Sequence, residues 1–212
     1  GMENRFEHLP LECSHLYLAI EGKLAAVICV EDPLREEAAD AVRELKEAGI
    51  TKVVMMTGDS ERTAAAIAKR VGVDEYYSEV LPEDKASFVE KEKELGHKVI
   101  MIGDGINDSL ALSSASVGIA ISDGAAIARE IADVTISADN LHEIVTLKRL
   151  STALMKRIHN NYRTIIGING GLIALGVTGI IMPTTSALLH NMSTLTISLR
   201  SMRNLLPKEE EA

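Results

Sequence analysis

The chain has 212 residues, 25% of them charged, and a formal net charge of −9. This acidic balance excludes the basic surface with which proteins bind nucleic acids, so we expect no nucleic-acid partner. The two cysteines, Cys13 and Cys29, lack C-x-x-C and metal-finger spacings, which indicates reduced thiols in the cytosol.

The first half of the chain alternates between short apolar runs and amphipathic segments. Two apolar runs around a Glu-Gly-Lys turn predict a β-hairpin, and a helix is expected from Asp32-Pro33 to Gly49. Strands and helices then alternate, which is typical of βαβ units. The predicted fold class is therefore α/β, a Rossmann-like parallel sheet with helices on both faces. The expected strands are 16–20, 24–30, 52–56, 76–80, 99–102, 116–121 and 134–136, and the later helices are 60–71, 83–95, a short one after Asn107, and 125–131.

The most informative segment surrounds the predicted strand at 99–102. That strand ends at Gly103 and Gly105, which allow a sharp turn with the backbone close to a ligand. Asp104 and Asp108 follow at the carboxyl end of the strand, where open α/β sheets place their sites. Their hard oxygen atoms suit Mg²⁺ held together with a phosphate. A capped βα turn would explain an isolated Gly-Asp-Gly equally well.

Two further clusters lie at predicted strand–helix junctions. Thr57-Gly58-Asp59 follows the strand at 52–56, where a hydroxyl and backbone N–H groups at a helix start form a phosphate site. A simple helix cap is the alternative. Lys85 opens the next helix, and its ammonium could neutralise a phosphoryl oxygen. Taken alone, Lys85 would be an ordinary surface lysine.

The motifs TGD, LPEDK and GDGIND, in this order, resemble the phosphorylation domain of P-type ATPases, a haloacid dehalogenase-like fold. The resemblance implies that Thr57 and Gly58 bind the phosphoryl group, and that Lys85 stabilises its charge in the transition state. It also implies Mg²⁺ and ATP as cofactors. The implied catalytic set is Thr57, Gly58, Asp59, Lys85 and Asn107, with Asp104 and Asp108 as Mg²⁺ ligands.

The carboxyl-terminal segment has a different composition. From residue 164 to residue 199 it carries no Asp, Glu, Lys or Arg, and basic residues flank this stretch on both sides. A membrane helix needs about 20 residues, so we expect two transmembrane helices with a turn at 183–185. Both ends should lie in the cytoplasm because of the basic flanks. A buried helical hairpin in a soluble protein is the alternative.

This segment resembles the last two membrane helices of the heavy-metal-transporting class of P-type ATPases. The expected domains are 1–30, the tail of a nucleotide-binding domain with its return strands; 31–143, the carboxyl-terminal part of the phosphorylation domain; 144–163, a basic connecting helix; and 164–206, two transmembrane helices. The expected location is the cell membrane, with the α/β domain on its cytoplasmic side.

Polar residues inside membrane helices are candidate functional groups. Imidazole with amides and hydroxyls favours Zn²⁺, Co²⁺ or Mn²⁺ over Cu⁺ as the transported ion, and helix–helix hydrogen bonding explains the same residues equally well. The candidate transported-metal site consists of Asn169, His190, Asn191, Ser193 and Thr194.

One departure from the family pattern stands out. The phosphorylated aspartate of P-type ATPases lies in a D-K-T-G-T segment, which this sequence lacks. Groups that assist a nucleophile do not replace it. The chain is thus expected to be the carboxyl-terminal piece of an ATP-driven transition-metal cation pump, inactive alone. Its expected partners are the transported cation, the lipid bilayer and the missing amino-terminal part of the pump, or a separate chain that supplies it.

Two alternatives stay open. The first is a non-catalytic module that binds Mg²⁺ or phosphate or pairs with another chain. The second is a free-standing haloacid dehalogenase-like phosphatase, against which the missing D-x-D or D-K-T-G-T argues, because Asp32 is followed by Leu34 where a second acid would be needed.

Overall fold

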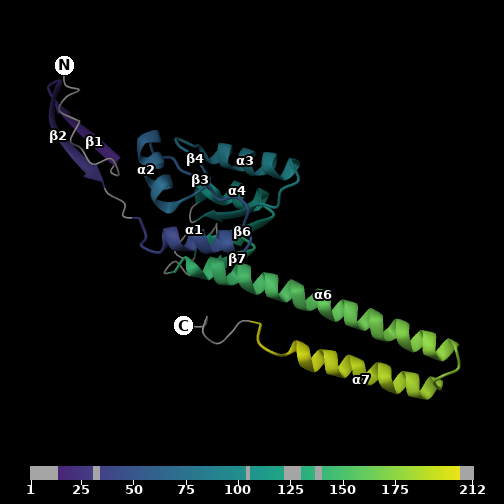
Figure 1. Ribbon diagram of the computed structural model, residues 1–212. Coiled ribbons are helices and arrows are strands. Elements are labelled where there is room, and N and C mark those ends of the chain that lie inside the picture. Colours follow the sequence, from purple (N-terminus) through teal and green to yellow (C-terminus); the bar gives the residue numbers. More distant parts are fainter. Residues whose placement is uncertain (1–13, 31–33, 104–105, 122–129, 137–139, 206–212) are drawn as a thin grey trace. The chain divides into compact units, whose positions relative to one another are not determined.

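The computed structural model describes residues 14–30, 34–103, 106–121, 130–136 and 140–205 (Figure 1). The chain divides into two units, Gly1–Val145 and Thr146–Ala212, which are described separately. The first unit contains the parallel strands and their helices, so the expected α/β class is confirmed.

The first unit begins with the expected β-hairpin. Strand β1 (Ser14–Ile20) pairs antiparallel with β2 (Lys23–Val30), with Ser14 opposite Val30 at the open end. Aliphatic and aromatic side chains of both strands are exposed, and those of Leu16 and Ile20 are 62% and 58% accessible.

The remaining elements of this unit follow the expected order with adjusted boundaries. They are α1 (Ala38–Glu47), β3 (Val54–Met56), α2 (Glu61–Val71), β4 (Glu75–Tyr77), α3 (Pro82–Glu94), β5 (Ile100–Gly103), the 3₁₀ turn η2 (Ile106–Asp108), α4 (Ser109–Ser114), β6 (Val117–Ile121) and β7 (Val134–Ile136). The predicted helix start at Asp32-Pro33 is outside the described residues, and α1 begins only at Ala38. Of the predicted helix at 125–131, only residues 130 and 131 are described.

Local sequence signals account for the boundaries of α2 and α3. The Ser60 hydroxyl accepts a hydrogen bond from the Thr63 N–H and caps α2, which ends at Gly72 in the left-handed conformation. Helix α3 begins with Pro82, where the missing N–H costs least. The Asp84 carboxylate accepts a hydrogen bond from the Leu81 N–H at 3.2 Å and so caps the first turn of α3.

The parallel strands are divided between two hydrogen-bonded sheets. Strands β3 and β4 form one, and β5, β6 and β7 form the other in that order. Helix α3 packs over both, because Val89 of α3 is fully buried in a cluster with Met101 of β5, and Met56 of β3 packs against that cluster. Among the described strands, the predicted parallel sheet therefore consists of two hydrogen-bonded parts beneath one helix.

The second unit is a pair of antiparallel helices. Helix α6 (His142–Val177) starts in the first unit and continues through the second, and α7 (Pro183–Ser201) returns alongside it (Figure 1). The predicted turn at 183–185 is therefore corrected, since the connection precedes Pro183, which is the first residue of α7. The basic segment 144–163 and the following apolar stretch form one helix.

The expectation of two transmembrane helices requires a correction. Among the helices in the described part of the chain, none combines the length and the apolarity needed to cross a bilayer. The composition explains this finding: the apolar portion of α6 follows the basic residues up to Arg163, and α7 carries His190, Asn191 and several hydroxyls among its aliphatic residues.

Candidate functional site

The predicted catalytic motifs lie at the carboxyl ends of parallel strands. Thr57, Gly58 and Asp59 follow β3, and Gly103 ends β5. Lys85 lies in the first turn of α3, which follows β4. Open parallel sheets place their sites at these ends, because the strand–helix loops gather there.

An ion pair joins the second and third motifs. Lys85 Nζ donates to Asp108 Oδ1 at 2.8 Å, across 23 positions in the sequence. Both side chains are largely buried, with 16% of Lys85 and 11% of Asp108 accessible. A buried charge needs a partner with good geometry, so each residue determines where the other lies.

Gly103 allows Asp108 to occupy this position. A Cβ atom at residue 103 would lie 2.7 Å from Asp108 Cβ and 2.8 Å from Asp108 Oδ2. Contacts this short would displace the Asp108 side chain from Lys85. The close approach of Asp108 therefore requires a glycine at position 103.

The loop after β3 is held by its own side chains. The Thr57 hydroxyl donates to Asp59 Oδ2 at 2.7 Å and accepts from the Asp59 N–H at 3.1 Å. Its backbone is tied to the loop after β4, because Val80 N–H donates to the Thr57 carbonyl at 3.0 Å and Glu79 N–H donates to the Asp59 carbonyl at 2.9 Å. These bonds position the TGD loop against the segment that leads into α3.

Next to this loop, a carboxylate on α2 holds the residues that follow β4. Glu61 accepts hydrogen bonds from the Ser78 hydroxyl and from the Tyr76 hydroxyl, the latter at 2.8 Å. These two bonds, that from Ser78 first, lower the pKa of the Glu61 carboxyl. The bond to Glu61 raises the pKa of the Tyr76 hydroxyl. The sequence offered no signal for this contact, since none of the three residues Glu61, Tyr76 and Ser78 belongs to a recognisable motif.

The remaining residues predicted for the catalytic and Mg²⁺ sites differ in where the structure places them. Asp104, the predicted Mg²⁺ ligand, lies outside the described residues. Asn107 is exposed on η2, whereas Asp108 is buried. Among the described residues no group of three or more His, Cys, Asp or Glu side chains is arranged to hold a metal ion. The oxygen donors that are present, from Asp108, Asp59 and Thr57, are of the hard type that Mg²⁺ prefers.

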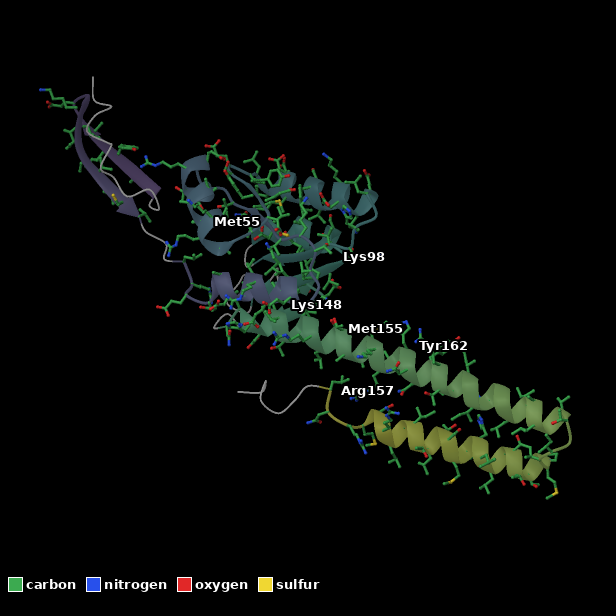
Figure 2. All side chains as sticks on the ribbon, viewed as in Figure 1. Met55, Lys98, Lys148, Met155, Arg157 and Tyr162 are labelled. Atoms are coloured by element: carbon green, nitrogen blue, oxygen red, sulfur yellow. The ribbon has the colours of Figure 1, made fainter. Side chains whose placement is uncertain are left out.

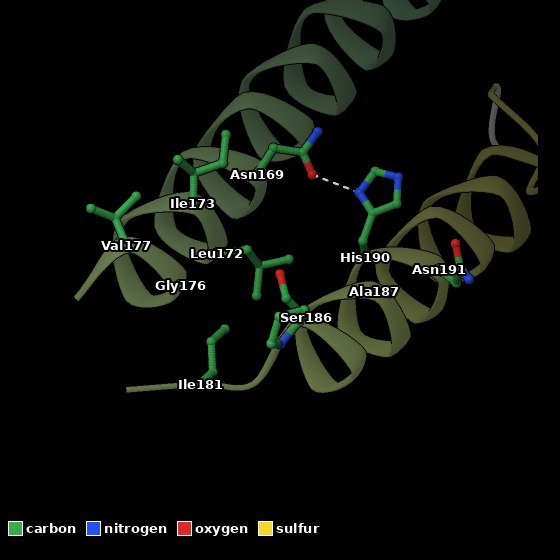
Figure 3. A pocket seen from close by; sticks show the side chains of 11 residues that line it. Asn169, Leu172, Ile173, Gly176, Val177, Ile181, Ser186, Ala187, His190 and Asn191 are labelled. Atoms are coloured by element: carbon green, nitrogen blue, oxygen red, sulfur yellow. Dashed lines mark hydrogen bonds between the residues drawn. The ribbon is translucent and has the colours of Figure 1, made fainter. Parts of the chain in front are cut away.

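The second unit brings two members of the predicted transported-metal site together. His190 of α7 donates through Nδ1 to Asn169 Oδ1 of α6 at 2.8 Å (Figure 3). Both line an apolar hollow of about 670 Å³ to which Asn191 also contributes. The Ser193 and Thr194 hydroxyls instead donate to the backbone carbonyl of His190, at 2.8 and 3.1 Å. These two hydroxyls are therefore engaged by their own helix.

Hydrogen bonds that the sequence did not predict join α6 to the carboxyl end of α7. Arg157 of α6 lies beside the carboxyl end of α7 (Figure 2). Its guanidinium donates to the carbonyls of Ser201 and Asn204, each at 3.0 Å, and also to that of Arg203. Asn161 adds a bond to the Ser201 hydroxyl at 2.7 Å. A basic side chain satisfies the unpaired carbonyls at a helix carboxyl end.

Comparison with known proteins identifies a matching protein family and several similar relatives of this chain. Residues 2–116 match the haloacid dehalogenase-like hydrolase family. The chain is 37% identical over 189 residues to a zinc-exporting P-type ATPase of Mycobacterium marinum, covering 89% of this chain and 26% of that protein. It is 44% identical over 176 residues to copper-transporting ATPase 2 of Rhizobium meliloti, covering 83% and 21%. A manganese-exporting P-type ATPase of Mycobacterium tuberculosis is 38% identical over 189 residues, covering 89% and 26%.

Solved structures agree. A zinc-transporting PIB-type ATPase in its E2.Pi state is 30% identical, with a TM-score of 0.83, and the match covers 97% of this chain and 33% of that chain. The catalytic domain of the CPx-ATPase CopB-B is also 30% identical, with a TM-score of 0.52, covering 62% and 52%. The chain thus spans about a quarter of the length of the curated relatives it matches.

Proposed function

Because the chain belongs to the haloacid dehalogenase-like hydrolases and its homologues are heavy-metal P-type ATPases, we propose that it is the carboxyl-terminal part of an ATP-driven transition-metal cation pump. The observation that carries this proposal is the ion pair of Lys85 with Asp108, which unites two motifs at the carboxyl end of β5.

In this proposal Lys85 stabilises the charge of a phosphoryl group. Its ammonium has three N–H donors, of which Asp108 takes one, so two are left for phosphoryl oxygens. The Thr57 hydroxyl, now bonded to Asp59, rotates to donate to the same group, and the Gly58 and Asp59 backbone lies at the start of α2, where anions bind well. Asp108 positions Lys85, and Asn107 lies beside it on the surface.

Asp104 and Asp108 are the residues that would hold Mg²⁺. Their carboxylates match its preference for oxygen ligands, and Asp108 accepts from Lys85 through Oδ1. The ion would neutralise phosphoryl charge when bound, with ATP delivered by the nucleotide-binding part of the pump. The absence of a D-K-T-G-T segment supports the view that the nucleophile comes from the rest of the pump or from a separate chain.

We further propose that the helix pair associates with the cell membrane, and that the α/β unit works on the cytoplasmic side. Support comes from the uncharged stretch 164–199 and its basic flanks. The transported cation would meet His190 in the hollow between α6 and α7. Since His190 donates through Nδ1 to Asn169, its ring is the tautomer whose Nε2 lone pair can bind a metal. The ligand set favours Zn²⁺, Co²⁺ or Mn²⁺.

Reconstitution tests the catalytic proposal. The chain alone should hydrolyse neither ATP nor a phosphate ester above background, and addition of the remaining pump polypeptide should restore metal-stimulated ATP hydrolysis. Lys85→Ala should abolish the restored rate while Lys69→Ala, an exposed lysine on α2, should preserve it. Phosphatase turnover by the chain alone that disappears in Asp108→Ala protein would instead favour a free-standing phosphatase.

Binding experiments test the cation site. Zn²⁺ or Co²⁺ titration of the full chain in detergent should show a site that His190→Ala removes and Asn169→Ala weakens. Ser193→Ala is the matched control, because its hydroxyl is bonded to the backbone of α7, and it should leave the affinity unchanged. Equal effects of all three substitutions would contradict a site at His190.

A further inference from the structure

A residue beside the candidate site has a left-handed backbone although it is not a glycine. Glu79, in the loop between β4 and α3, has a φ of 53°. Residues with a Cβ atom rarely adopt this conformation, because the Cβ lies too close to the following carbonyl oxygen. Among the described residues other than glycine, only Glu21, in the turn of the β-hairpin, also has a positive φ. Contacts of the surrounding loop must therefore hold Glu79 in this conformation.

The conformation of Glu79 directs two consecutive N–H groups to the TGD loop. Glu79 N–H donates to the Asp59 carbonyl at 2.9 Å, and Val80 N–H donates to the Thr57 carbonyl at 3.0 Å. In an extended strand, successive N–H groups point to opposite sides. Two successive bonds to one loop thus require a break in the extended backbone, which the positive φ of Glu79 supplies. The two bonds hold the carbonyl groups on either side of Gly58.

The Glu61 carboxylate holds the residue that precedes Glu79. Its Oε2 accepts from the Ser78 hydroxyl, and its Oε1 accepts from the Tyr76 hydroxyl at 2.8 Å. These bonds, that from Ser78 first, lower the pKa of Glu61, so the ionised carboxylate accepts both at neutral pH. Glu61 is the first residue of α2, two positions after Asp59. The segment around Glu79 is therefore tied both to α2 and to the TGD loop.

We propose that Glu61 is a positioning residue for the loop Thr57-Gly58-Asp59. By holding Ser78, it keeps Glu79 in the left-handed conformation that directs the two N–H groups to this loop. Without Glu61, the segment relaxes toward an ordinary backbone conformation, and the bonds to the loop are made less often. That this loop meets a phosphoryl group rests on the proposed function. Glu61 itself acts through Ser78 and Glu79 and touches no reacting group.

Amide exchange in the full chain, held in detergent, tests the link between Glu61 and the backbone of Glu79. Glu61→Ala should raise exchange at residues 79 and 80 by at least about fivefold, the usual bias against the left-handed conformation. Glu79→Gly removes that bias, so its addition to Glu61→Ala should restore most of the protection. Glu21→Gly relieves the same kind of strain in the hairpin turn, and its addition should restore none.

Three further variants separate the Glu61 contact from its surroundings. Ser78→Ala removes the same hydrogen bond from the other partner and should reproduce the effect of Glu61→Ala. Glu61→Gln keeps an amide oxygen that accepts from the Ser78 hydroxyl, so its effect should be smaller. Glu75→Ala is the matched control, because this acid on β4 pairs with Lys52 at 2.9 Å, and it should leave exchange at residues 79 and 80 unchanged.

Kinetics of the reconstituted pump test the consequence for the site. Glu61→Ala should lower kcat by at least about fivefold through misplacement of the loop, with an unchanged KM for ATP, and Glu79→Gly should recover most of the loss. The proposal is overturned if Glu61→Ala leaves exchange at residues 79 and 80 unchanged, if Glu21→Gly restores protection as well as Glu79→Gly does, or if kcat is unaffected. A wild-type reconstituted pump without ATPase activity would instead count against the proposed function, while the exchange experiment would still test the role of Glu61.

Discussion

Lys85 Nζ and Asp108 Oδ1 lie 2.8 Å apart, although 23 positions separate the residues in the sequence. This contact links the first turn of α3 to the turn that precedes α4. Neither side chain is more than one-fifth accessible, so removal of either partner would leave the other charge poorly solvated and unpaired.

Lys85→Met should destabilise the first unit. Removal of one partner leaves the buried Asp108 carboxylate uncompensated, at a cost of about 2 kcal/mol once the residual exposure of the pair is considered. Hydrogen exchange in β5 and α4 measures the loss. Lys85→Met combined with Asp108→Asn should recover part of it, and additive effects in that double variant would show that the two side chains do not interact.

Gly103→Ala should have a similar effect by a steric route. The new Cβ would lie 2.7 Å from Asp108 Cβ, so either the aspartate or β5 must move, with a cost of about 1–3 kcal/mol. Gly58→Ala is the matched control, since a Cβ there meets nothing within 4 Å. Comparable thermal shifts for both variants would rule out the close approach as the cause.

The contact of Glu61 with Ser78 and Tyr76 should depend on pH at both extremes. The pKa of Glu61 is lowered in the folded state, so its contribution is fully present above the ordinary value of about 4.3 and is lost as the pH falls through the folded value. The pKa of Tyr76 is raised, so its contribution is present below about 10 and is lost as the pH rises through the folded value.

Substitution separates the two hydrogen bonds. In a carboxyl NMR titration, Ser78→Ala should raise the pKa of Glu61 more than Tyr76→Phe does, because the Ser78 bond is the larger cause of the shift. The opposite order would mean that the tyrosine holds the carboxylate.

The tautomer of His190 should depend on Asn169. With Nδ1 donating to the Asn169 amide oxygen, the ring nitrogens should give the NMR shifts of an Nδ1-protonated imidazole. Asn169→Leu removes this acceptor and should shift the ring toward the Nε2-protonated form. Thr194→Ala, whose hydroxyl serves the helix backbone, should leave the tautomer unchanged, and an identical shift in that variant would argue against a specific effect of Asn169.

Arg157→Ala should loosen the end of α7. Three carbonyls lose their donor, so exchange at residues 199–205 should rise, consistent with a local loss of about 2 kcal/mol. Lys156→Ala changes a neighbouring, exposed basic residue and should have little effect. Similar exchange rates in the two variants would mean that the guanidinium does not hold the helix end.

Much of the fold could be predicted because its signals are local. The alternation of apolar strands and capped helices, such as β3 followed by Ser60 and α2, indicates βαβ units from a window of a few residues. The hairpin at 14–30 could be predicted from local signals in the same way. The helix pair was expected too, but its bilayer-spanning character was wrong, because lack of charge between 164 and 199 does not by itself make α6 and α7 sufficiently apolar.

The sequence by itself determined the motifs TGD, LPEDK and GDGIND, their order and hence the family. Each motif is a run of consecutive residues, so it can be read directly from the chain. Only the tertiary structure decided that Lys85 pairs with Asp108, that Gly103 must lack a Cβ, and that His190 meets Asn169. These contacts join residues from separate elements, so they depend on how α3 packs on β5 and α7 on α6. The separation of β3 from β5 has the same origin, since strand pairing is a long-range choice that side-chain alternation alone does not specify.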